Sequence, residues 1–155
     1  MVYKKILVAI DGSDSSKKAY LHALSLAQLS GAEVLLVHVA ISPEDTWGGY
    51  ATASKLINMD ELNAITKEII DSTFSASDAE GVDVSTIVLH GKPAKEIVKA
   101  ALIENVDLII TGGHSLGSVS NLFQGSVSLR IVQTAHCPVM VINDHPGIHM
   151  EVAGQ

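Results

Sequence analysis

The sequence has 155 residues, of which 47% are hydrophobic, and a formal net charge of −7. The length favours a single domain, and the hydrophobic content is too high for a disordered chain. The negative charge argues against a general nucleic-acid binder and against docking on an anionic membrane. No apolar run approaches the roughly 18 to 20 residues of a membrane span, and no signal-peptide core follows the N-terminus, so we expect a cytoplasmic protein. A single cysteine, Cys137, excludes an intrachain disulfide.

Short β-branched segments alternate with longer segments of helical periodicity along the whole chain. In chain order the predicted elements are a strand at Tyr3–Ile10, a helix at Ser15–Leu29 capped by Ser13 or Asp14, a strand at Glu33–Ala40, a helix from Asp60 to Glu80 capped by Asp60, a strand at Val84–Leu89, a helix opened by Pro93, a strand at Asp107–Thr111, a helix at Ser126–Ala135 and a strand at Pro138–Ile142.

Two stretches show no clear period. Residues Ile41–Met59 include Pro43 and Trp47, and we interpret this stretch as a flap or a short helix beside a site, since long loops in compact domains are usually functional or mobile. Residues 144–155 are predicted to be a flexible tail that follows a domain of residues 1–143.

Near-continuous apolar strands separated by helices indicate a parallel sheet that is covered on both faces. Right-handed crossovers then predict a doubly wound α/β fold with five strands in the order 3-2-1-4-5. Ligands in such sheets bind outside the carboxyl ends of the strands, where the strand order reverses. Strands one and four flank that crevice, and their ends carry Asp11 and the run Thr111–Gly113.

The glycine-rich segment Gly112–Ser126 follows a strand and precedes a helix. Unpaired backbone N–H groups and the helix dipole make such a turn an anion-binding site, and the Ser126 hydroxyl adds a donor. The spacing is neither that of a Walker P-loop nor that of a dinucleotide-binding fingerprint. From composition alone, an ordinary surface loop is an equally good interpretation.

The sequence resembles the universal stress protein family over nearly its whole length. The similarity is carried by KKILVAIDGS at Lys4–Ser13, GKPAKEI at Gly91–Ile97 and HCPVMVI at His136–Ile142. ATP-binding members of that family carry G-2x-G-9x-G-[ST] after the fourth strand. Gly112, Gly125 and Ser126 match this pattern, whereas the second glycine falls on Ser115.

The resemblance implies an adenine-nucleotide site formed by Ala9, Asp11, Val39, Thr111, Gly112, Ser115, Gly125, Ser126 and Val127. It implies that Val39 meets adenine through its backbone while Ala9 lines the same pocket. It also places Asp11 near the ribose or phosphates, Gly112 at the ribose, and the last four residues around the phosphates. No lysine or arginine lies between Gly112 and Gln124, so we expect binding to need Mg²⁺ or Mn²⁺, with Asp11 near the phosphate-bound metal.

Several of these residues also have simpler interpretations. Asp11 could cap the turn into the first helix, and His38, inside an apolar strand, is expected to be a structural histidine. His114 lies in the glycine-rich loop and is interpreted as solvated. Ser115 either tolerates a bound phosphate or disables the site, because a left-handed backbone there would cost on the order of 1 kcal/mol.

The resemblance implies a regulatory or stress-response module that binds ATP, ADP or AMP and acts on an unknown protein partner. The alternatives are a nucleotide-free dimeric interaction protein of the same family and a slow ATPase. Fast phosphoryl transfer is not expected, because the loop offers no arginine finger or lysine. We also expect a homodimer that pairs through Pro138–Ile142, which would otherwise form an exposed apolar edge.

Overall fold

The computed structural model describes residues 2–40, 59–75, 77–113 and 121–143. Strands and helices alternate regularly along these segments. The elements are β1 (Lys5–Ala9), α1 (Asp14–Ser30), β2 (Glu33–Ala40), α2 (Met59–Thr73), β3 (Val84–His90), α3 (Pro93–Ile103), β4 (Leu108–Gly112), α4 (Asn121–Thr134) and β5 (Val139–Ile142). Within the described ranges, no helix has the length and apolar character that crossing a membrane requires.

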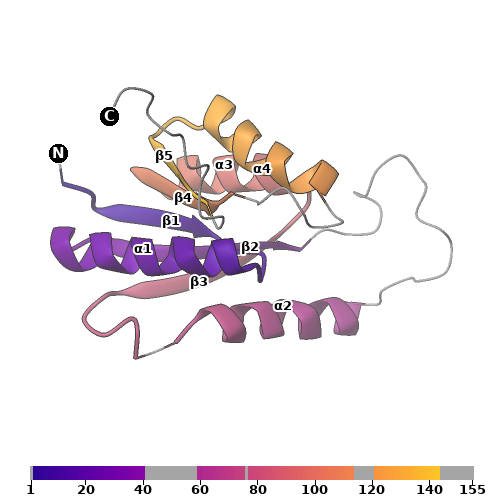
Figure 1. Ribbon diagram of the computed structural model, residues 1–155, viewed down its shortest axis with the longest axis horizontal. Coiled ribbons are helices and arrows are strands. Elements are labelled where there is room, and N and C mark those ends of the chain that lie inside the picture. Colours follow the sequence, from indigo (N-terminus) through magenta and orange to yellow (C-terminus); the bar gives the residue numbers. More distant parts are fainter. Residues whose placement is uncertain (1, 41–58, 76, 114–120, 144–155) are drawn as a thin grey trace, which may run out of the picture.

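The five strands form one parallel sheet in the order β3-β2-β1-β4-β5, as predicted. The central strand β1 pairs with β2 on one side and with β4 on the other, so Ala9 lies opposite both Val37 and Thr111. Figure 1 shows α1 in front of the sheet and α3 and α4 on its other side. The carboxyl ends of β1, β2 and β4 therefore meet at one edge of the sheet.

Each face of the sheet has its own aliphatic core, because alternate residues of a strand point to opposite faces. On one face, Ile6 and Val8 of β1 pack with α1 around the buried Tyr20. On the other face, Leu7 of β1 packs with α3 and α4 around Ile131. We call these the α1-side core and the α3/α4-side core.

The boundaries of α1 follow from its end residues. Ser13 is the N-cap, and its hydroxyl accepts a hydrogen bond from the Ser16 N–H at 3.2 Å. At the other end, Gly31 adopts the left-handed conformation with φ 74° and donates its N–H to the Ala27 carbonyl. A residue without a side chain avoids the strain of that conformation. Of the two predicted caps, Ser13 is the correct one.

The prediction for α2 was wrong at both ends. The helix begins at Met59, so Asp60 lies in the first turn instead of capping it. It ends at Thr73, well before Glu80. Near this end, the hydroxyls of Ser72 and Thr73 both donate to the Ile69 carbonyl, at 3.0 and 2.9 Å. Such local side-chain bonds compete with the backbone ladder, which explains why the helix stops within a serine- and threonine-rich segment.

The predicted start of α4 at Ser126 was also wrong, because the helix begins at Asn121. Gly125 and Ser126 therefore lie inside the helix and not at its end. A glycine inside a helix costs about 1 kcal/mol relative to alanine, which is too little to stop a helix that other interactions support. Only the first four N–H groups of a helix lack intrahelical partners, and Gly125 and Ser126 lie beyond them.

Candidate functional site

The carboxyl edge of the sheet brings together four of the predicted site residues. Ala9 and Thr111 are paired across β1 and β4, and Gly112 follows Thr111 as the last residue of β4. Val39 lies two residues beyond Val37, which is the β2 partner of Ala9, and it therefore points to the same face as Ala9. The structure thus places these four positions at one edge of the sheet, and their role in binding stays a prediction.

An apolar wall lines this edge on the α3/α4 side. Ala9, Val39, Leu89 and Val127 all belong to or pack against the α3/α4-side core, although they come from β1, β2, β3 and α4. Val39 is 8% exposed, and Ala9 and Val127 are half-buried. Small aliphatic side chains at the rim of a core form the kind of apolar surface on which a planar base can rest. Leu89 was missing from the predicted site, although its place at the end of a predicted strand was a usable signal.

Asp11 lies in the turn between β1 and α1, where it is exposed. Its carboxylate accepts a hydrogen bond from the Ser13 N–H at 2.9 Å, and its own N–H donates to the Ser16 hydroxyl at 3.4 Å. The capping interpretation is therefore correct as a local role. The carboxylate also stands beside the N-terminus of α1, where the helix dipole favours a negative charge.

Gly112 fits where no other residue would, because β4 ends directly against the first turn of α1. A Cβ atom at this position would lie 2.5 Å from the Ser15 hydroxyl oxygen, and 2.8 Å from both the Ser15 carbonyl carbon and the Ser16 nitrogen. Ser15 and Ser16 are each only 2% exposed, so this packing belongs to the interior. The sequence interpretation of Gly112 as a ribose contact missed this packing role. Ser15 lies far from Gly112 in the sequence, so no local pattern pointed to this contact.

The next residue, Gly113, fixes the other side of the same strand end. Its N–H donates to the Ile142 carbonyl at 2.7 Å, and a Cβ here would come within 2.6 Å of Asn143 Oδ1 and 2.9 Å of Val141. The Gly112–Gly113 pair thus holds the end of β4 between α1 and β5.

His38 has the structural role predicted for it. The imidazole is 7% exposed, and its Nδ1 lies 2.9 Å from the Ile10 carbonyl oxygen. A carbonyl only accepts hydrogen bonds, so the proton resides on Nδ1. This bond joins β2 to Ile10, the residue before Asp11, and so helps to hold the start of the β1–α1 turn in place.

Ser115 and His114 lie outside the described residues, as do the stretch 41–58 and the tail 144–155. Among the residues that the structure describes, no group of three or more histidine, cysteine, aspartate or glutamate side chains is arranged to hold a metal ion.

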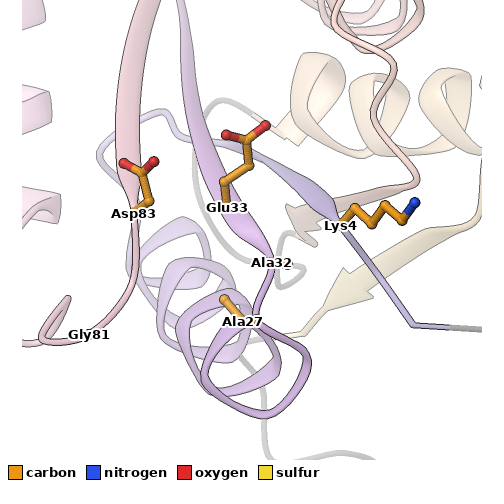
Figure 2. Close-up of a pocket in the computed structure, with 7 residues that line it drawn as sticks. Lys4, Ala27, Ala32, Glu33, Gly81 and Asp83 are labelled. Carbon is orange, nitrogen blue, oxygen red and sulfur yellow. The ribbon is translucent and has the colours of Figure 1, made fainter.

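A separate hollow of about 410 Å³ lies at the opposite, amino edge of the sheet (Figure 2). It is lined by Lys4, Ala27, Gly31, Ala32, Glu33, Gly81 and Asp83. The lining residues come from the end of α1 and from the starts of the first three strands. In Figure 2 the carboxylates of Glu33 and Asp83 flank the small residues, and Lys4 extends on the other side. This hollow is distinct from the candidate nucleotide site.

Comparison with known proteins identifies the family. The universal stress protein family profile matches residues 2–143. Universal stress protein MJ0531 of Methanocaldococcus jannaschii is 34% identical over 145 residues, which cover 91% of this chain and 82% of that protein. The chain therefore belongs to the universal stress protein family.

Solved structures of relatives show the same fold. The structure of MJ0577, also from Methanocaldococcus jannaschii, is 29% identical with a TM-score of 0.69, and the match covers 95% of this chain and 100% of that one. A universal stress protein from Archaeoglobus fulgidus, solved in complex with dAMP, is 26% identical with a TM-score of 0.66, and the match covers 92% and 99% of the two chains.

Proposed function

We propose that the protein is a regulatory module that binds an adenine nucleotide at the carboxyl edge of its sheet. The observation that carries this proposal is the convergence of an apolar wall (Ala9, Val39, Val127) with the Asp11 turn and the Gly112 strand end. The dAMP bound to the Archaeoglobus fulgidus relative supports an adenine nucleotide as the ligand class.

In this proposal the adenine base rests on the apolar wall, and the backbone at Val39 contacts its edge. The side chains of this wall are aliphatic and contact only the base, through shape complementarity and dispersion. The wall therefore does not distinguish AMP, ADP and ATP. Contacts between Asp11 and the start of α4 would then distinguish ligands that differ in their number of phosphates. The free N–H groups in the first turn of α4 favour an anion there.

Asp11 sets the metal dependence in this proposal. A carboxylate near a triphosphate repels it unless a cation lies between them, and Mg²⁺ is usually held by one or two carboxylates together with phosphate oxygens. Asp11 is exposed and lies at the turn, so it suits that role. A monophosphate that stops short of Asp11 needs no metal.

The experiment is calorimetric titration of the purified protein with AMP and with ATP, each in the presence of Mg²⁺ and in excess chelator. Asp11→Asn is the informative variant, because the amide oxygen still accepts the Ser13 N–H while the charge is gone. We expect it to weaken Mg-ATP binding and to reduce the difference that chelation makes. Asp14→Asn, an exposed acid in the first turn of the same helix, is the matched control and should bind like wild type.

Two further results decide the alternatives. Nucleotide released from the freshly purified, denatured protein identifies the resident ligand. Ser115→Gly tests whether the serine disables the motif. If wild type bound no adenine nucleotide under any condition and only Ser115→Gly did, the nucleotide-binding proposal would be wrong for this chain, and the nucleotide-free interaction protein would replace it.

We also propose that two copies pair through the edge strand β5. Val141 of β5 is 37% exposed, and the exposed apolar side chains Leu129 and Val132 lie on α4, which packs against that strand. Apolar edge strands are generally covered in native proteins. Light scattering should give a lower mass for Val141→Lys than for wild type; an unchanged mass would refute the pairing.

A further inference from the structure

The second edge strand of the sheet is β3, and its sequence lacks the residues that usually protect an edge strand. Its sequence, Val84–His90, reads VSTIVLH and contains no lysine, glutamate or proline. Thr86, Val88 and His90 are exposed among the residues that the structure describes, with Val88 at 39%, and α2 packs mainly over β2. Long, uncharged, exposed edges readily pair with another strand.

Two hydrogen bonds at the ends of β3 show which of its backbone groups face away from β2. The Asp83 carbonyl accepts from the Val34 N–H at 2.8 Å, and the Gly91 N–H donates to the Ala40 carbonyl at 3.4 Å. The N–H and C=O of one strand residue point the same way, and the direction alternates along the strand. Odd-numbered residues therefore face β2. The residues whose backbone groups face outward are Val84, Thr86, Val88 and His90.

We propose that a second copy of this chain adds to the sheet here, with the two β3 strands antiparallel around a two-fold axis at Ile87. This is the register that pairs all seven residues of both strands. It sets Thr86 opposite Val88, and Val84 opposite His90, as hydrogen-bonded pairs. The outward-facing groups are thus satisfied reciprocally, with on the order of eight bonds across the axis.

The side chains fit the same register. No charged residue lies within β3, so self-pairing opposes no like charges. At each end, Asp83 of one copy lies opposite Gly91 and therefore next to Lys92 of the other copy. Both charged residues are exposed. The two ends of the paired strands thus carry complementary charges, which favours a second copy over an unrelated peptide as the partner.

This interface is separate from β5 and does not depend on nucleotide binding. Both contacts are isologous and lie at opposite edges of one sheet. A chain that uses both forms tetramers and longer assemblies with a continuous sheet. A chain that uses β3 alone forms a dimer.

Cysteine cross-linking tests the register directly. In a Cys137→Ala background, Ile87→Cys places two thiols opposite each other in a non-hydrogen-bonded pair, where the Cα atoms are about 4.5 Å apart and within disulfide range. We expect Ile87→Cys to form a covalent dimer with oxidised glutathione, and Ser85→Cys not to. Leu29→Cys, at an 86% exposed position away from β3, measures collisional cross-linking. Cross-linking of Ser85→Cys, or equal yields at 87 and 29, would overturn the proposal.

Sedimentation velocity over a range of concentrations tests the assembly without cysteines. Thr86→Pro removes an outward N–H and leaves the bonds to β2 intact, so the fold should tolerate it at an edge. We expect this variant to weaken the β3 association at least roughly tenfold, as the loss of about 1.4 kcal/mol would. Asp83→Lys should also weaken it, and adding Lys92→Asp should restore it. Assemblies of wild-type mass in Thr86→Pro, with a native circular dichroism spectrum, would refute the interface.

Discussion

Replacing Gly112 with alanine tests whether this glycine is required by packing. The new methyl group would point into the first turn of α1, with the Ser15 hydroxyl at 2.5 Å and two backbone atoms, the Ser15 carbonyl carbon and the Ser16 nitrogen, at 2.8 Å. The hydroxyl could rotate away, but the backbone atoms move only if α1 shifts relative to β4. Since α1 also packs on β1 and β2, that shift disturbs the whole α1-side core.

The expected cost follows from this geometry. Adding one methyl group to a close-packed interior typically costs 1–3 kcal/mol, and contact with backbone favours the upper half of that range. For a chain of 155 residues, each kcal/mol lowers the melting temperature by about 2–4 °C. Gly112→Ala should therefore melt roughly 4 to 12 °C below wild type.

The assay is urea unfolding and thermal melting of both proteins, freed of nucleotide by unfolding and refolding and checked by mass spectrometry. A glycine that is needed only for ligand contact would give equal stabilities without ligand. Equal midpoints for wild type and Gly112→Ala would therefore refute the packing argument. Adding Ser15→Gly to Gly112→Ala should recover only part of the loss, because the two backbone contacts remain.

Three further predictions concern single side chains. The Tyr20 hydroxyl is buried without a hydrogen-bond partner in the part of the chain that the structure describes. The free energy of unfolding of Tyr20→Phe, measured in urea at pH 7, should therefore equal that of wild type or be higher by up to about 1 kcal/mol. Burial raises the pKa of Tyr20 to about 12. The protonated hydroxyl therefore makes its full contribution to stability below pH 10, and this contribution is lost as the pH rises to 12. Tyr20→Phe should lose less stability than wild type over that range, and parallel losses would contradict this. Ser13→Ala removes the cap on the Ser16 N–H and should cost about 1 kcal/mol in unfolding free energy, whereas Ser13→Asn should cost little; equal losses would argue against capping. Burial, reinforced by the negative charge of Asp107, raises the pKa of the Cys137 thiol, so its reaction with iodoacetamide should still be accelerating above pH 9, and a plateau below pH 9 would be inconsistent with this.

The sequence predicted the sheet well because its strands are apolar runs with clear ends. The boundaries of β2 were predicted without error, and the strand order followed from general rules for parallel sheets. The helix ends were harder. The periodicity of α2 continues past Thr73, but hydroxyl groups near that point bond to the helix itself. At α4, the glycine at 125 was read as a boundary although the helix passes through it.

The candidate site was predictable where it depends on topology. Ala9, Val39 and Thr111 lie at strand ends, so the strand order alone brings them to one edge. The role of Gly112 was not predictable in the same way. Its partner Ser15 is far away in the sequence, and the contact depends on how closely α1 approaches β4. A pattern of residue types does not carry that distance.

The central position of β1 has a consequence for folding during synthesis. This strand pairs with β2 early, but its other neighbour is β4, and the Lys4 N–H bonds to the Asp107 carboxylate at 2.8 Å while Lys5 bonds to Glu104 at 2.9 Å. Until β4 leaves the ribosome, one side of β1 is an open apolar edge. Such non-local pairing slows folding and exposes the nascent chain to aggregation. The strand that is synthesised first is thus among the last to gain both of its neighbours, and until then its unpaired edge stays open to aggregation.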